Sequence, residues 1–115
     1  MLDNLGAIWP NLAARGVTHL ALARVVEDRG ERDGYRHAVP AANTVCRLVA
    51  DERVRVDRLL ARMAPGPALE WDLRRTVEIE RTLEARAVED FVVANGARSV
   101  REVALDVLIG ARWIT

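Results

Sequence analysis

The stretch PAANTVCRLVADERVRVDRLLARM, from Pro40 to Met63, decides how the rest of this 115-residue chain is interpreted. Its first half places Val45, Leu48 and Val49 at the i, i+3, i+4 spacing of a helix face. The charged run DER follows, and VRVDRLLARM then repeats the helical spacing. The pattern predicts two helices around the charged run or one continuous helix from Ala41 to Ala64, and the spacing is compatible with both.

Composition is typical of a globular protein with a single domain. Half of the residues are hydrophobic and 30% are charged. No apolar run approaches the roughly 18 residues that span a bilayer. The N-terminus, MLDNLGAIWP, has neither the basic start nor the long apolar stretch of a signal peptide. We therefore expect a cytoplasmic protein.

The charges balance, and every positive side chain is an arginine. The chain has seventeen arginines and seventeen acidic residues, and it has no lysine. This absence excludes a Schiff-base lysine and the lysine of a phosphate-binding loop. Residues 1–66 carry a net charge of +2 and residues 67–115 a net charge of −2. Nucleic-acid binders usually show a larger basic excess, so this balance counts against that class.

Capping signals predict where the first helices begin and end. Asp3 is a suitable N-cap for a helix to about Arg15, and Gly16 can end it in the left-handed conformation. Thr18 is an N-cap for a second helix, which Gly30 would end.

Breaks and caps also organise the rest of the chain. The segment from Asp28 to Pro40 has two glycines, many charges and little apolar content, so it is predicted to be a loop. APGP is the clearest break, and a long helix is predicted after it, from about Ala68 to Ala94. Ser99 and Glu102 match a capping box at the start of a last helix, which Gly110 would end.

The order of GVTHLALARVV, AVPAANTVCRLVADE and RVRVDRLLARMA resembles the helix-turn-helix of phage-repressor (Cro/C1-like) regulators. That family has a T-x-x-x-L-A helix, a recognition helix of the S-x-x-T-V-S-R-I kind and a bracing D-x-L-L-x-x-A helix. The resemblance covers about 45 residues, and its turn exceeds ten residues where the motif has about three or four. The matching positions are Thr18, Leu22, Ala23, Asn43, Thr44, Val45, Arg47, Leu48, Asp57, Leu59, Leu60 and Ala64.

This resemblance implies that the predicted recognition helix, which contains Asn43 and Arg47, lies in the major groove of DNA. Asn43 would then pair with adenine and Arg47 with guanine. The alternative is that these polar side chains form a solvated helix face. Phosphate and backbone contacts would come from Thr44, Arg53 and Arg55 and from the loop residues Arg32, Arg36 and His37.

Such modules usually bind DNA as dimers, and the C-terminal half offers a dimerisation element. It contains a long helix, a capped helix and the apolar tail ARWIT. Because an exposed apolar tail is costly, we expect it to pack on the domain or on a second copy. The predicted dimerisation residues are Leu83, Phe91, Val107, Trp113 and Ile114.

The sequence offers little for catalysis or metal binding. His19 and His37 have no Cys, Asp or Glu partner at metal-ligand spacing. Ser99 is already a predicted cap, and Cys46 lies in an apolar pattern typical of a small buried residue. We therefore predict no enzyme activity, no cofactor and no metal. No Glu-x-x-His motif accompanies the three glutamates of the long helix, Glu78, Glu80 and Glu84.

These patterns predict an all-α, single-domain bundle of about five to six helices. Residues 1–64 would form a helix-turn-helix half and residues 68–115 a dimerisation half. The predicted function is sequence-specific DNA binding by a small homodimeric transcriptional regulator. The rival prediction is a helical protein–protein interaction module, such as an antitoxin-like, adaptor or assembly subunit, without DNA binding. A basic face would favour DNA, whereas an exposed apolar surface would favour a protein partner.

Overall fold

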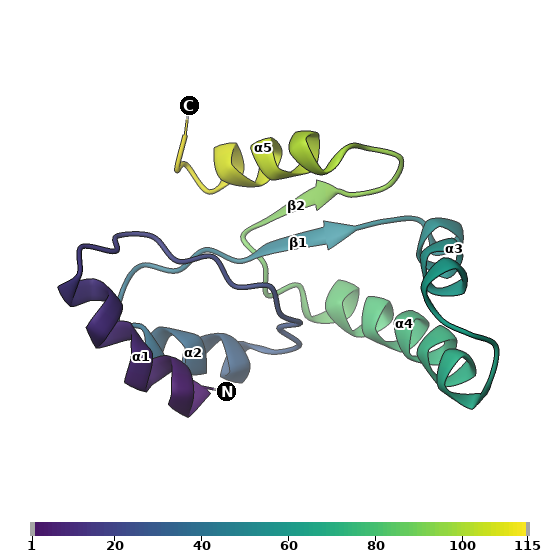
Figure 1. Cartoon of the computed structure of the whole chain (residues 1–115), viewed down its shortest axis with the longest axis horizontal. Helices are drawn as coiled ribbons and strands as arrows, with labels where there is room; N and C mark the ends of the chain where they lie inside the picture. The colour runs from purple at the N-terminus through teal and green to yellow at the C-terminus, as the bar shows by residue number, and fades with distance from the viewer. Residues whose placement is uncertain (1, 115) are drawn as a thin grey trace. The chain divides into compact units, whose positions relative to one another are not determined.

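A computed structural model describes residues 2–114, which form five helices and two short strands (Figure 1). The mostly helical prediction is confirmed, but the all-α class is wrong because the two strands pair in a parallel sheet. The chain divides into two compact units, unit 1 (Met1–Asn43) and unit 2 (Thr44–Thr115). Within residues 2–114, every helix is too short or too polar to cross a membrane.

Unit 1 consists of two helices that pack on each other, α1 (Leu2–Ala14) and α2 (Arg29–Ala38). The first predicted helix is confirmed, although Asp3 lies in its first turn and is not its N-cap, and Gly16 follows it with a left-handed φ of 89°. Leu5 is the buried apolar side chain of α1. The α1–α2 contact is close at Gly6, since a Cβ there would lie 3.8 Å from the carbonyl oxygen of Ala38.

Two predictions for unit 1 are wrong. The predicted second helix lies where residues 17–27 have no regular secondary structure. The predicted loop is instead α2, which begins because Asp28 accepts a hydrogen bond at Oδ1 from the Glu31 amide, at 2.8 Å. This cap stabilises a polar sequence that composition alone marks as a loop. Gly30 therefore lies in the first turn of a helix and does not end one.

Unit 2 is built around two parallel strands, β1 (Cys46–Val49) and β2 (Phe91–Ala94), with Cys46 opposite Phe91. The predicted recognition helix is therefore wrong, because its apolar run forms β1. Periodicity does not distinguish a short apolar run in a helix from one in a strand, and the pairing with FVVA decides it.

The connection between the strands contains α3 (Glu52–Arg62) and α4 (Pro67–Arg86). The helix predicted after the charged run is confirmed as α3, although Asp51 makes no side-chain cap hydrogen bond. The long helix begins as predicted but ends earlier, at Ala87 in the left-handed conformation, with a φ of 45°. The FVVA segment that the prediction included in it is β2.

The last helix, α5 (Val100–Gly110), has the predicted bounds, and the Ser99 hydroxyl accepts a hydrogen bond from the Glu102 amide. Because side chains alternate along a strand, Arg47 lies on one face of the sheet and Phe91 on the other. Helix α4 reaches the Arg47 face and α5 packs on β2, where Gly110 lies close to the Phe91 ring. The buried apolar side chains of unit 2 are Leu59, Leu69, Val88, Val93 and Val103.

Candidate functional site

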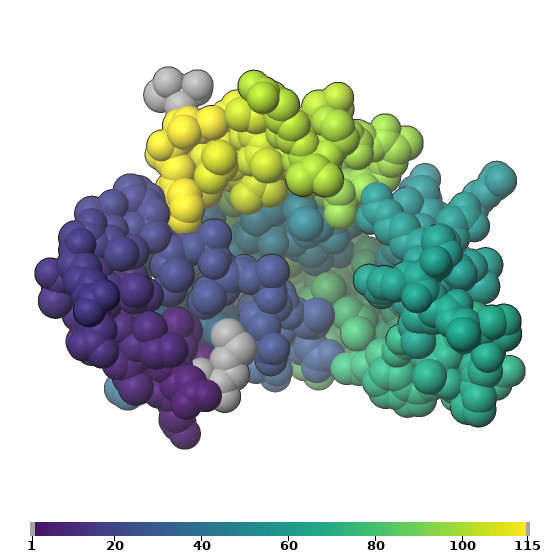
Figure 2. All heavy atoms as spheres, viewed as in Figure 1, coloured from purple at the N-terminus to yellow at the C-terminus, as the bar shows by residue number. Residues whose placement is uncertain are grey.

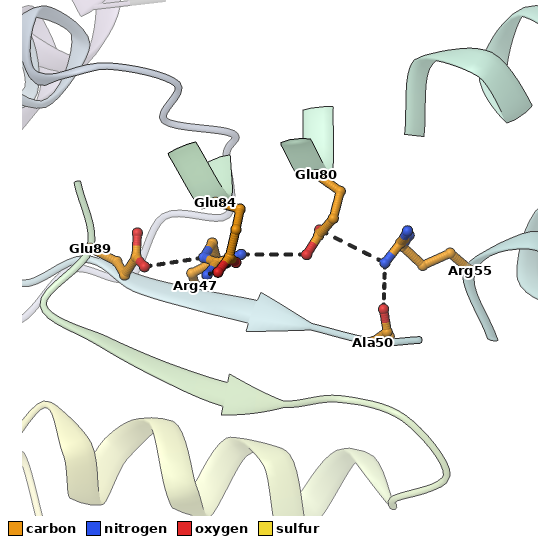
Figure 3. Close-up of polar contacts among 6 residues, drawn as sticks. All are labelled: Arg47, Ala50, Arg55, Glu80, Glu84 and Glu89. Atoms are coloured by element: carbon orange, nitrogen blue, oxygen red, sulfur yellow. Dashed lines mark hydrogen bonds and ion pairs between the residues drawn. The ribbon is translucent and has the colours of Figure 1, made fainter. Parts of the chain in front are cut away.

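The most connected polar site in unit 2 surrounds Arg47, whose side chain is only 10% exposed (Figure 3). Its guanidinium contacts three carboxylates: Glu84 at 2.8 Å, Glu89 at 3.2 Å and Glu80 at 3.4 Å. Glu80 and Glu84 lie one turn apart on α4, and Glu89 precedes β2. Arg47 therefore joins β1 to helix α4 and to the segment just before β2.

A second arginine, Arg55 of α3, extends the cluster. Glu80 lies between the two arginines, with one oxygen 3.8 Å from Arg55 and the other 3.4 Å from Arg47 (Figure 3). Arg55 also donates to the carbonyl oxygen of Ala50 at 2.5 Å, which ties the start of α3 to the end of β1. Its Nε is buried and has no hydrogen-bond partner among residues 2–114.

The charge of this cluster is not basic, since two arginines face three glutamates. Burial alone would lower the pKa of Arg47, but the hydrogen bonds and negative charges of Glu84 and Glu89 outweigh burial and raise it. Arg47 is therefore charged at every relevant pH and is held by fixed partners. This arrangement can stabilise a fold, but it does not present a guanidinium to an incoming base or phosphate.

The structure separates the residues that were predicted to contact DNA. Arg47 and Arg55 meet in the glutamate cluster, Arg53 is exposed in the first turn of α3, and Thr44 is exposed before β1. Unit 1 holds the other two, where the Asn43 Oδ1 accepts from the Nε of Arg36 at 3.2 Å. The same Oδ1 also accepts from the buried Arg32 at 3.3 Å.

The predicted dimerisation residues are also divided between the interior and the surface. Leu83, Phe91 and Val107 are half-buried within unit 2. Trp113 and Ile114 remain exposed, at 40% and 39%. Sequence reasoning also missed the exposed apolar side chains of α5, which include Val100, Leu105 and Ile109, although the i, i+4 spacing of the last two is visible in the sequence.

The acidic residues of α4 do not form a metal site. In residues 2–114, no group of three or more His, Cys, Asp and Glu side chains is placed to hold a metal ion. Glu80 and Glu84 are engaged by Arg47, and Glu78 pairs with Arg75 at 3.6 Å. Glu89 completes the cluster, and no local spacing in the sequence connects it to Arg47, 42 positions away.

A shallow hollow of about 520 Å³ lies between α3 and the loop after β2. Arg58 at its rim donates to the carbonyl oxygen of Asn95 at 2.5 Å, and Arg98 is paired with Asp106 at 2.6 Å. Arg58 and Arg98 therefore both have partners within unit 2. The hollow is lined by Val54, Asp57, Arg58, Ala61, Ala97 and Arg98.

No protein-family model, no curated protein and no solved structure matches this chain. The functional assignment therefore depends on the geometry of its own residues.

Proposed function

We propose that this chain is a protein–protein interaction module that self-associates through α5 and the residues that follow it. The observation that carries this proposal is a set of exposed apolar side chains, called here the α5–tail surface and made of Leu105, Ile109, Trp113 and Ile114. These four side chains are 39–49% exposed. In the space-filling view, the yellow-green atoms of α5 and the tail lie uncovered by the rest of unit 2 (Figure 2).

Helix α5 is apolar on two opposite faces. Val103 and Val107 point to the core with Gly110, which lies against the Phe91 ring. Leu105 and Ile109 lie about half a turn away, on the opposite face. A helix that is apolar on both sides is typical of an element that is covered on both sides. We infer that a second polypeptide covers the outer face.

A second copy of this chain is the partner that we propose. A two-fold symmetric contact places the same surface of two copies together, so the apolar side chains of one copy would meet those of the other, and such contacts are the commonest in soluble homo-oligomers. None of the three charged residues of α5 lies between Leu105 and Ile109 on the outer face, because these two residues follow each other at one helical turn. Burying these side chains in a dimer removes apolar area from water, which drives association.

Sedimentation velocity tests this proposal with the full chain. We expect a dimer of twice the 12.8 kDa chain mass, and we expect Ile109→Glu to shift the protein to monomer. Leu60→Glu is the matched control, because Leu60 is 53% exposed on α3, away from the α5–tail surface. A wild-type monomer at high protein concentration, or a dimer that Ile109→Glu leaves intact, would contradict the proposal.

Sequence-specific DNA binding is the other function that the sequence predicts, and it stays a prediction. Its proposed recognition helix is replaced by β1, and the Arg47 side chain is held by three glutamates. The exposed apolar surface therefore gives the interaction module the stronger support.

A further inference from the structure

The outward face of α4 differs in charge from its inward face. Residues at three- and four-residue spacing, beginning with Trp71, share the outward face. Trp71 is 57% exposed, which is unusual for the largest side chain on a helix that already has an apolar face. This outward face, called here the Trp–Arg face, consists of Trp71, Arg74, Arg75, Glu78 and Arg81.

The Trp–Arg face has a net positive charge, although the chain is neutral. It carries three arginines and Glu78, which pairs with Arg75 at 3.6 Å, and the exposed Glu70 lies one turn before Arg74, so the excess is about one positive charge. The side chains of Arg74 and Arg81 are exposed and make no hydrogen bond or ion pair with any residue that the structure describes. Two other acidic residues of α4, Glu80 and Glu84, point to the opposite face and bind Arg47.

The tryptophan lies beside two of these arginines in a shallow hollow of about 360 Å³, lined by Trp71, Arg74, Arg75 and Glu78. An exposed indole ring offers a flat surface on which a base can stack. A guanidinium beside it offers the forked donors that match a phosphate. Ten residues separate Trp71 from Arg81, so the face extends about 15 Å along the helix and can contact more than one phosphate.

We propose that the Trp–Arg face binds single-stranded nucleic acid, with a base stacked on Trp71 and neighbouring phosphates held by the arginines. Bases in a duplex stack on each other and are not available to an indole ring, so the tryptophan selects a single strand. Charge complementarity identifies a polyanion as the ligand, and the exposed ring identifies one that carries bases. This site is separate from the α5–tail surface, and the proposal does not depend on dimerisation.

Fluorescence anisotropy with a labelled oligothymidylate of about twelve nucleotides tests this proposal on the full chain. We expect binding whose affinity falls steeply with salt, because arginine–phosphate contacts release counterions. Trp71→Ala should weaken binding about tenfold, and Trp71→Phe should keep part of the affinity because a phenyl ring also stacks. Arg74→Glu and Arg81→Glu should weaken binding and reduce the salt dependence.

Arg101→Glu is the matched control, because Arg101 is an exposed arginine of α5 outside this face. Circular dichroism of each variant checks that the fold is retained, which the exposure of Trp71 leads us to expect. Absence of binding at low salt would overturn the proposal, as would binding that Trp71→Ala leaves unchanged. Equal affinity for duplex DNA, or for polyglutamate with the same dependence on Trp71, would also overturn it, the latter in favour of an acidic protein partner.

Discussion

Arg47 of β1 and Glu89, which precedes β2, form an ion pair with 3.2 Å between Nε and Oε1, and their side chains are only 10% and 11% exposed. The pair connects positions that are 42 residues apart at one end of the parallel sheet. Because both charges are largely withdrawn from water, each depends on the other for compensation. The residue that sequence reasoning assigned to a guanine contact is therefore part of the internal structure of unit 2.

Removal of Arg47 should destabilise unit 2. Arg47→Ala would leave Glu89 buried without its cation and Glu80 with only the longer Arg55 contact. We expect the free energy of unfolding to fall by roughly 3–5 kcal/mol, as for a broken buried ion pair. Urea denaturation followed by circular dichroism measures this change.

Glu84→Ala is the control for this prediction. Glu84 makes the shortest contact to Arg47, 2.8 Å, but its side chain is 73% exposed. Exposed ion pairs contribute less than about 1 kcal/mol, so the loss should be small. If Glu84→Ala were as destabilising as Arg47→Ala, contact length rather than burial would determine the contribution.

Gly110 of α5 should not tolerate a side chain. A Cβ at this position would collide with the ring of Phe91, so Gly110→Ala must displace that ring. We expect a loss of about 1–3 kcal/mol, despite the better helix propensity of alanine. Gly6→Ala in α1 is the matched control, because its Cβ would meet atoms no closer than 3.8 Å. Thermal unfolding should show the first variant destabilised and the second stabilised by up to about 1 kcal/mol.

Two of the N-caps of unit 2, Ser99 and Asp51, should differ in their contribution to stability. The Ser99 hydroxyl accepts a hydrogen bond from the Glu102 amide at 3.1 Å, so Ser99→Ala should cost about 1 kcal/mol. Asp51 makes no side-chain cap hydrogen bond at the start of α3, so Asp51→Ala should change stability much less. Equal losses in denaturant titrations would show that Asp51 caps α3 in solution.

The single thiol should react slowly. Burial raises the pKa of Cys46, so less of it is thiolate near neutral pH. We expect disulfide exchange with Ellman's reagent to be slower in the folded protein than in concentrated denaturant, with the difference narrowing as pH rises. Because the folded state holds this proton more tightly, stability should fall as pH rises through the range where the thiol ionises. A folded-state rate equal to the denatured rate would contradict this prediction.

Duplex DNA distinguishes the helix-turn-helix hypothesis from the observed fold. That hypothesis predicts a preferred site among genomic fragments that Arg47→Ala abolishes and Arg53→Ala weakens. Since Arg47 is held in a strand by carboxylates, we expect no such preferred site. Fragment selection at low salt is the measurement, and one specific site lost with a folded Arg47→Ala protein would restore the hypothesis.

Local signals predicted the elements that depend on local chemistry. Gly16, left-handed after the first helix, and the last helix from Ser99 to Gly110 lie where a break and a cap place them. Helix α3 lies where the helical spacing places it, without a side-chain cap from Asp51. Each of these signals acts within about one helical turn, so it can be recognised from neighbouring residues alone. For the same reason, the Asp28 cap is visible in the sequence, although composition suggested a loop there.

Only the tertiary structure decided the strand at Cys46–Val49, the strand at Phe91–Ala94 and the environment of Arg47. A short apolar run becomes a strand when another run is available to pair with it, and that partner lies 45 positions away. Likewise, an arginine is a ligand-binding group or a structural one according to the carboxylates that surround it, and Glu80, Glu84 and Glu89 reach Arg47 only through the fold. Local sequence signals thus determined the positions of α1, α3 and α5, whereas long-range pairing determined where the strands form and which charges remain available to a partner.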